Sequence, residues 1–247
     1  MTLDASHACV IDLDGVVWLD GSALPGAVEG VELLRREGVP VLFATNNASP
    51  ALGELLDRLA AIGLSASRDE IATSALAAAS LLAAGTRSYV LGGEGLREAA
   101  GSRGLVLTED EAAAVLVGLT VDFDYQRLDR AAAFVRSGAR FIATNTDPTL
   151  PVRGGQRPGA GAIVAAVSTA AGRAPEVAGK PHAAMCDLVR SRGAVGAVVG
   201  DRASTDGAFA VALGVPFAHV RSGMEAPPSD AAVCAGSLLE AVTALLG

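Results

Sequence analysis

Short apolar runs alternate with longer segments of helical periodicity along most of the chain. The runs consist mainly of valine, leucine, isoleucine and alanine, as is typical of strands that are buried on both faces of a sheet. Strand-length runs that alternate with helical segments predict a parallel or mostly parallel α/β sheet. We expect strands at 7–11, 39–44, 88–91, 113–119, 140–144, 195–199 and 217–220, and helices at 27–37, 50–62, 69–84, 94–101, 125–137, 161–171, 183–191, 205–213 and 236–245.

The alternation restarts in the middle of the chain. The segment from 88 to 171 contains its own strands and helices, and the pattern of the first part resumes after Pro175. We therefore expect a Rossmann-like, mostly parallel sheet core made of residues 1–84 and 176–247, with a smaller α/β domain at 85–175 inserted into it.

The composition fits a globular α/β protein and argues against two classes of partner. Of the 247 residues, 51% are hydrophobic and 19% are charged, and the formal net charge is −8. An acidic chain is a poor match for nucleic acid, because that binding depends on cationic groups that neutralise phosphates. The longest apolar stretches, 75–84 and 163–171, are too short to cross a bilayer, so we expect no membrane partner.

The N-terminal residues and the cysteines bear on the compartment. Residues 1–7 lack the basic start and the apolar core of a signal peptide. Cys9, Cys186 and Cys234 are odd in number and widely spaced, so we interpret them as reduced thiols. The expected location is cytoplasmic.

Two carboxylates end the first predicted strand. Asp12 and Asp14 are one residue apart, so their side chains should point to the same face. Ligand-binding groups gather at the carboxyl ends of strands in α/β sheets. The pair is therefore a candidate for acid–base chemistry, for metal binding or for both.

Three further polar segments are candidates for the same site. They are Thr45-Asn46-Asn47 after the second strand, Gly179-Lys180-Pro181, and Gly200-Asp201 with Asp206 after the strand at 195–199. Taken alone, each has an ordinary explanation, namely a helix cap at Ser49, a surface lysine and a carboxylate in a first helical turn. Their common setting in the two outer blocks favours a single site.

The order of these segments resembles that of the motifs of the haloacid dehalogenase (HAD) superfamily of phosphatases and phosphotransferases. The matching residues are Asp12-Leu13-Asp14-Gly15, Thr45, Lys180, and Gly200-Asp201 with Asp206. More narrowly, the chain is similar to the NagD-like branch, which includes phosphoglycolate, glycerol-phosphate and pyridoxal-phosphate phosphatases. The resemblance implies a HAD-like core with a large α/β cap between the second and third motifs, where the domain at 85–175 stands.

Hydrolysis of a phosphate ester needs a nucleophile, a proton donor and neutralisation of charge. Asp12 would attack phosphorus to give an aspartyl-phosphate, and Asp14 would be the general acid and then the general base. The resemblance implies Mg²⁺ held by Asp12, Asp201 and the backbone carbonyl of Asp14. Crowded carboxylates would raise the pKa of Asp14 and keep it protonated.

The other motif residues would bind the phosphoryl group or support the site. Thr45, Asn46, Asn47 and Lys180 are the expected phosphate-binding residues, and Lys180 would also balance the charge on Asp12. Asp206 would support Lys180 or a metal-bound water.

Substrate choice should reside in the inserted domain, because the core groups address only the phosphoryl group that all esters share. Asn145, Thr146 and Asp147 follow a predicted strand there and are candidates for the selecting loop. A polar turn before Pro148 explains them equally well. No substrate contact is assigned to Arg202.

The favoured function is a Mg²⁺-dependent phosphatase acting on a small phosphorylated metabolite such as phosphoglycolate, glycerol phosphate or a sugar phosphate. A non-catalytic sensor of a phospho-ligand and a phosphotransferase or mutase remain as alternatives. A homodimer is compatible with the contacts that caps make in similar proteins.

Overall fold

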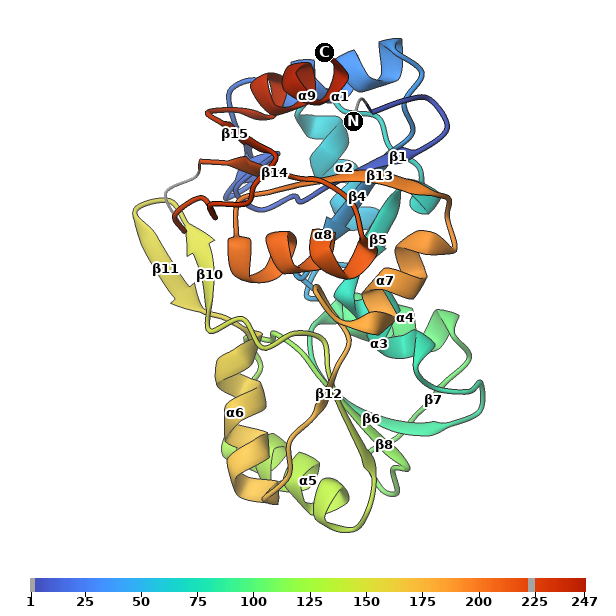
Figure 1. The fold of residues 1–247 in the computed structure, drawn as a ribbon. Helices are drawn as coiled ribbons and strands as arrows, with labels where there is room; N and C mark the ends of the chain where they lie inside the picture. Colours follow the sequence, from blue (N-terminus) through green and yellow to red (C-terminus); the bar gives the residue numbers. More distant parts are fainter. Residues whose placement is uncertain (1–2, 222–224) are drawn as a thin grey trace.

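The computed structural model describes residues 3–221 and 225–247. They are arranged around two sheets, each built of parallel strands (Figure 1). The larger one, the core sheet, has six strands in the order β15-β14-β13-β1-β4-β5, and all of its neighbours are parallel. Its strands are β1 (Ala8–Ile11), β4 (Val41–Thr45), β5 (Ile71–Thr73), β13 (Val195–Gly200), β14 (Phe217–Val220) and β15 (Val233–Ala235). The predicted parallel α/β core is confirmed.

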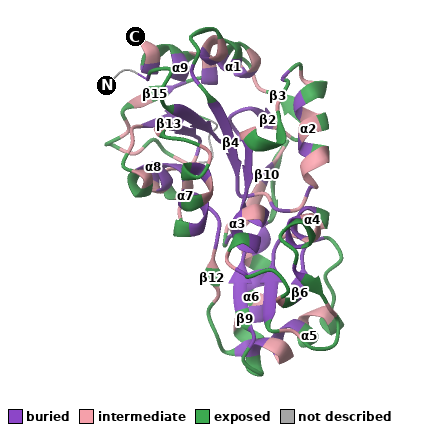
Figure 2. Cartoon of the chain, turned by 90° about the vertical axis from the view of Figure 1, so that its right-hand side faces the viewer, coloured by how far each residue is buried: buried purple, intermediate pink, exposed green. Residues whose placement is uncertain are grey.

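Alternate residues of each central strand face opposite layers of helices. In β1, Cys9 and Ile11 pack with α1 (Ala27–Arg36), α2 (Leu52–Ala61) and α9 (Leu238–Leu246). Ala8 and Val10 face the other side, where the helices are α3 (Ser74–Ser80), α7 (Ala183–Arg190) and α8 (Ala208–Leu213). Burial on both faces explains the continuous apolar runs in the sequence, and the central strands β1 and β4 are buried along their length (Figure 2 shows β4).

The second sheet has five parallel strands in the order β12-β9-β8-β6-β7. They are β6 (Arg87–Leu91), β7 (Val106–Leu107), β8 (Ala114–Val117), β9 (Arg140–Ala143) and β12 (Glu176–Val177). One face packs on α5 (Tyr125–Arg136) and α6 (Ala160–Ala171). The other face packs on α4 (Glu94–Ser102) and on α3, so that one apolar cluster continues from the second sheet into the core.

Two antiparallel hairpins approach each other beside the core sheet. The first is β2 (Trp18–Leu19) with β3 (Ser22–Ala23), and the second is β10 (Thr149–Val152) with β11 (Gly155–Pro158). The backbone N–H of Arg153, in the turn of the second hairpin, donates to Asp20 Oδ2 of the first at 3.2 Å. In Figure 1 the second hairpin reaches from the lower half of the molecule to the edge of the upper half.

Several predicted elements differ from the structure. The helix expected at 69–84 is instead a short 3₁₀ turn (Arg68–Glu70), strand β5 and helix α3. The helix starts late because the Thr73 hydroxyl accepts a hydrogen bond from Leu76 N at 3.2 Å and thereby caps α3. The helix expected at 205–213 begins instead as a π-helix over Ala203–Gly207, before α8.

The short or polar strands β2, β3, β7, β10, β11, β12 and β15 are absent from the sequence prediction. Strand β12 also shows that the second sheet extends to Val177, two residues past the expected boundary at 175. Among the described residues, no helix has both the length and the apolar character needed to span a bilayer.

Candidate active site

Three of the predicted site residues stand at the same edge of the core sheet. Asp12 directly follows β1, Thr45 is the last residue of β4, and Asp201 directly follows β13. Strand β1 lies between the other two, and all three strands run in parallel. The carboxyl ends of the strands therefore bring together side chains that are far apart in the sequence.

Lys180 reaches this edge from the segment after β12 and is almost completely buried. Its ammonium group donates to Asp12 Oδ1 at 2.6 Å, to Asp206 Oδ1 at 2.6 Å and to Ala44 O at 2.8 Å. Three acceptors match the three hydrogens of an ammonium group. Burial acts to lower the pKa of Lys180, but the two carboxylates outweigh it and raise that pKa above its usual value.

Asp12 and Asp14 have different surroundings. Burial raises the pKa of Asp12, the ammonium of Lys180 opposes this shift, and the neighbouring carboxylates add to it. Asp14 Oδ1 accepts a hydrogen bond from Trp18 Nε1 at 3.0 Å, and its Oδ2 accepts one from the Thr45 hydroxyl at 3.4 Å. The two carboxylates therefore differ in their partners.

The raised pKa that the sequence analysis expects for Asp14 is present, but its cause is different. Burial of the carboxyl raises its pKa, and the hydrogen bond from Trp18, the charge of Lys180 and the hydrogen bond from Thr45 act against the shift. The crowding of carboxylates bears instead on Asp12.

Three carboxylates are close enough to share a cation. Oxygens of Asp12, Asp201 and Asp206 lie within 4.8 Å of one another, and all three residues are buried. A Cβ atom on Gly15, whose φ is +98°, would stand 2.2 Å from Asp201 Oδ2. Glycine is therefore needed beside Asp201 both for backbone conformation and for space.

Asn46 links Lys180 to the loop that follows β9. Its Oδ1 accepts from Lys180 N at 2.8 Å, and its Nδ2 donates to Lys180 O at 3.2 Å and to Asp147 Oδ2 at 3.1 Å. Asn47 N donates to the Thr45 hydroxyl at 2.9 Å, and Asn47 Oδ1 accepts from Ser49 N at 3.2 Å. The side chains of Asn46 and Asn47 are thus engaged with protein groups.

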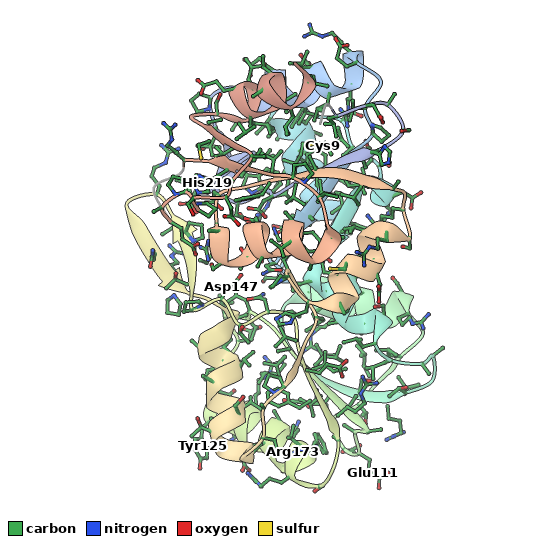
Figure 3. All side chains as sticks on the ribbon, in the orientation of Figure 1. Cys9, Glu111, Tyr125, Asp147, Arg173 and His219 are labelled. Carbon is green, nitrogen blue, oxygen red and sulfur yellow. The ribbon has the colours of Figure 1, made fainter. Side chains whose placement is uncertain are left out.

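Asn145 and Asp147, two of the three loop candidates of the inserted segment, lie in different places. Asp147 lines the same cleft as Asp12 and stands where the two halves of the molecule meet (Figure 3). Asn145 is buried and does not line the cleft: its Nδ2 donates to Asn46 O at 2.6 Å and its Oδ1 accepts from Asp147 N at 3.0 Å. Asn145 therefore positions the loop, and Asp147 faces the cleft.

The cleft has a volume of about 370 Å³ including its open mouth. Besides the predicted residues it is lined by Arg202, Thr205 and the strand residues Thr149–Pro151. Arg202 Nη2 donates to Thr149 O at 3.4 Å, which links the motif after β13 to the second hairpin. The sequence predicts no substrate contact for Arg202, although its place directly after Asp201 is a signal that it lies near the site.

Comparison with known protein families gives one match. A family model described as haloacid dehalogenase-like hydrolase matches residues 9–106, which include Asp12, Asp14 and the segment Thr45-Asn46-Asn47.

Similar proteins with assigned names extend the likeness over most of the chain. A D-glycerol 3-phosphate phosphatase of Mycobacterium tuberculosis is 40% identical over 228 residues, which are 88% of this chain and 64% of that protein. An acid sugar phosphatase of Staphylococcus haemolyticus is 35% identical over 87% of this chain and 85% of its own length.

Solved structures of similar proteins show the same likeness in the fold. The glycerol phosphate phosphatase Rv1692 of M. tuberculosis, in complex with magnesium, superposes with a TM-score of 0.87 at 35% identity, over 98% of this chain and 78% of that one. NagD from Escherichia coli K-12 superposes with a TM-score of 0.86 at 29% identity, over 97% and 98% of the two chains. The chain therefore belongs to the haloacid dehalogenase-like hydrolases and is a phosphatase of their NagD-like branch.

Proposed function

We propose that the protein is a Mg²⁺-dependent phosphatase that hydrolyses a small phosphomonoester through an aspartyl-phosphate on Asp12. The observation that carries the proposal is the buried contact of Lys180 with Asp12 and Asp206, beside a second carboxylate, Asp14, that also lines the cleft. A binding protein needs no nucleophile paired with a proton donor. The arrangement therefore supports catalysis over a non-catalytic sensor.

The proposed reaction has two steps. In the first, a carboxylate oxygen of Asp12 forms a bond to phosphorus while the bond from phosphorus to the ester oxygen breaks, and Asp14 gives its proton to the departing alcohol. In the second, a water oxygen bonds to phosphorus, Asp14 takes the proton of that water, and inorganic phosphate leaves Asp12. Burial around Asp14 favours the protonated form that the first step requires.

The donor set fits Mg²⁺, which prefers oxygen ligands and keeps several waters. Asp12 and Asp201 would hold the ion with the backbone carbonyl of Asp14, and Asp206 is engaged with Lys180. The bound ion would neutralise negative charge on the phosphoryl group. The magnesium complex of the M. tuberculosis relative supports this choice of metal.

The second sheet and its helices would form a cap, with residues 1–84 and the chain after β12 as the core. The cap contributes Asp147 and Thr149–Pro151 to the cleft, and the core contributes Arg202. A carboxylate that accepts hydrogen bonds and a guanidinium that donates them suit a leaving group with hydroxyl groups. Glycerol phosphate and sugar phosphates are therefore the favoured substrates, and the names of the relatives support both. Phosphoglycolate, whose leaving group carries a carboxylate in place of further hydroxyls, would depend on the guanidinium of Arg202 alone.

The test is phosphate release from a panel of these monoesters with and without Mg²⁺. Wild type, Asp12→Asn and the control Asp57→Asn, which changes an exposed carboxylate, are compared. We expect Asp57→Asn to match wild type and Asp12→Asn to lose nearly all activity. Undiminished activity of Asp12→Asn would contradict the mechanism, and an inactive wild type would favour the sensor.

Two further measurements refine the test. Addition of an acceptor alcohol shows whether a new phosphomonoester forms, which would indicate phosphotransfer in place of hydrolysis. Arg202→Gln should reduce kcat/KM for glycerol phosphate more than for p-nitrophenyl phosphate, whose leaving group has no alkyl hydroxyl. An equal loss on both would contradict the proposed contact with the leaving group.

A further inference from the structure

His219 is a polar side chain in the middle of an apolar strand. It lies in β14 between Ala218 and Val220 and is fully buried. Its ring stands edge-on to that of Phe217, with centroids 6.0 Å apart and planes at 77° (Figure 3 shows His219 within the core). A buried imidazole is costly unless it is hydrogen-bonded, so its presence here calls for a partner.

That partner is the backbone of a metal-site residue. His219 Nε2 lies 3.1 Å from Asp201 O. A carbonyl oxygen can only accept a hydrogen bond, so Nε2 carries the hydrogen and donates it. Within residues 3–221 and 225–247, the structure gives the other ring nitrogen, Nδ1, no hydrogen-bond partner. Among the described residues, the hydrogen bond that the structure gives the ring is therefore the one to Asp201.

The contact is made where the chain leaves β13. Gly200, the last residue of β13, pairs with His219 across the sheet, and Asp201 is the next residue. A π-helix begins two residues later, at Ala203. Holding the Asp201 carbonyl fixes the peptide plane at this exit, and with it the direction in which the Asp201 carboxylate faces Asp12.

We propose that His219 is a positioning residue that sets the affinity of the site for a divalent cation by holding the backbone of Asp201. This inference rests on the metal site proposed above. It concerns a residue that lies behind that site and touches neither the cation nor the substrate. Partners that orient metal ligands in this way commonly change metal affinity by about 10- to 100-fold when removed.

The test compares side chains that keep or lose the donor. His219→Leu removes it at similar volume, and His219→Met is a second variant without a donor in case the first does not fold. His219→Gln restores an N–H at a comparable distance along the side chain. Val220→Ala is the matched control, because it removes packing from the neighbouring buried position of the same strand.

Binding of Mg²⁺ alone is measured by titration calorimetry and by the rise in Tm with Mg²⁺ concentration. We expect His219→Leu to raise the Kd for Mg²⁺ about tenfold or more. The Mg²⁺ concentration for half-maximal phosphate release should rise in parallel, while kcat at saturating Mg²⁺ stays close to that of wild type. His219→Gln should recover most of the affinity, and Val220→Ala should lower Tm with an unchanged Kd.

Three results would overturn the inference while leaving the proposed function intact. They are an unchanged Kd in the variants without a donor, a Kd for His219→Gln as weak as that for His219→Leu, and an equal weakening by Val220→Ala. A wild-type protein that binds no Mg²⁺ would instead overturn the proposed metal site together with the inference.

Discussion

Replacement of Lys180 by methionine tests the buried charge cluster most directly. The substitution keeps an unbranched side chain but removes the ammonium that contacts Asp12 and Asp206, each at 2.6 Å. With an effective dielectric constant of about 20, each contact contributes about 6 kcal/mol of Coulomb energy before the cost of burial is subtracted. Because two carboxylates are left buried without their partner, the net loss in unfolding free energy should be about 3–5 kcal/mol.

The loss should depend on pH with a definite sign. Without Lys180, the contribution that lowers the pKa of Asp12 is gone, so that pKa rises further above its value in the unfolded chain. A carboxyl whose pKa is higher in the folded state binds more protons there, so its folded form loses stability as pH rises through that range. The deficit of Lys180→Met relative to wild type should therefore shrink when pH is lowered from about 7 to about 5.

Urea unfolding followed by circular dichroism, in buffer with a chelator to remove Mg²⁺, measures this deficit. The double variant Lys180→Met/Asp206→Asn should recover part of the loss, because it removes one of the two uncompensated charges. A Lys180→Met protein within about 1 kcal/mol of wild type at pH 7 would refute the reasoning, since breaking a buried pair normally costs more than this.

Three further predictions concern single positions. Gly15→Ala should lower both Tm and activity, because the new Cβ meets the aspartate that follows β13 and the positive φ costs about 1–3 kcal/mol. The control Gly53→Ala, which has open space around it, should lower neither Tm nor activity. Burial raises the pKa of Asp14, so hydrolysis of an alkyl phosphate should fall as pH rises through that pKa; a flat profile into alkaline pH would contradict its role as acid. A thiol reagent should label only the exposed Cys234 rapidly in the native protein, because Cys9 is buried with its pKa raised to about 12; mass spectrometry after brief labelling checks this.

The sequence predicts the core of this fold because burial on both faces leaves a strong pattern. The strands at β1, β4 and β13 are continuous apolar runs, and each ends at a polar segment. Parallel pairing then brings Asp12, Thr45 and Asp201 to one edge. The position of these side chains follows from topology and needs no knowledge of detailed packing.

Other elements carry no such local signal. Strand β5 is only three residues long and merges with the alanine-rich helix that follows, so the periodicity indicates one long helix. The hairpin of β10 and β11 is partly exposed, and β11 contains glycine, glutamine, arginine and proline. These strands form through pairing with each other, which the hydrophobic pattern of either one does not encode.

The electrostatic environment of the site depends on burial, which the identity of its residues does not reveal. A count of charges suggests that carboxylate neighbours dominate at Asp14, but the degree of burial is a property of the folded chain. The contact of Arg202 with Thr149 is likewise invisible in the sequence, because it joins residues 53 positions apart. Contacts between residues so far apart in the sequence cannot be predicted from a local motif.

Lys180 is the single lysine of the sequence; the other members of the 19 lysines and arginines are all arginines. Its amine is enclosed by three acceptors in the folded protein. An amine-reactive reagent can acylate this side chain only when the site opens. The extent of acylation at Lys180, measured by mass spectrometry of the peptide that contains it, therefore reports how often the site opens. If bound phosphate or metal keeps the site closed, acylation slows, and this can be followed without an engineered probe residue.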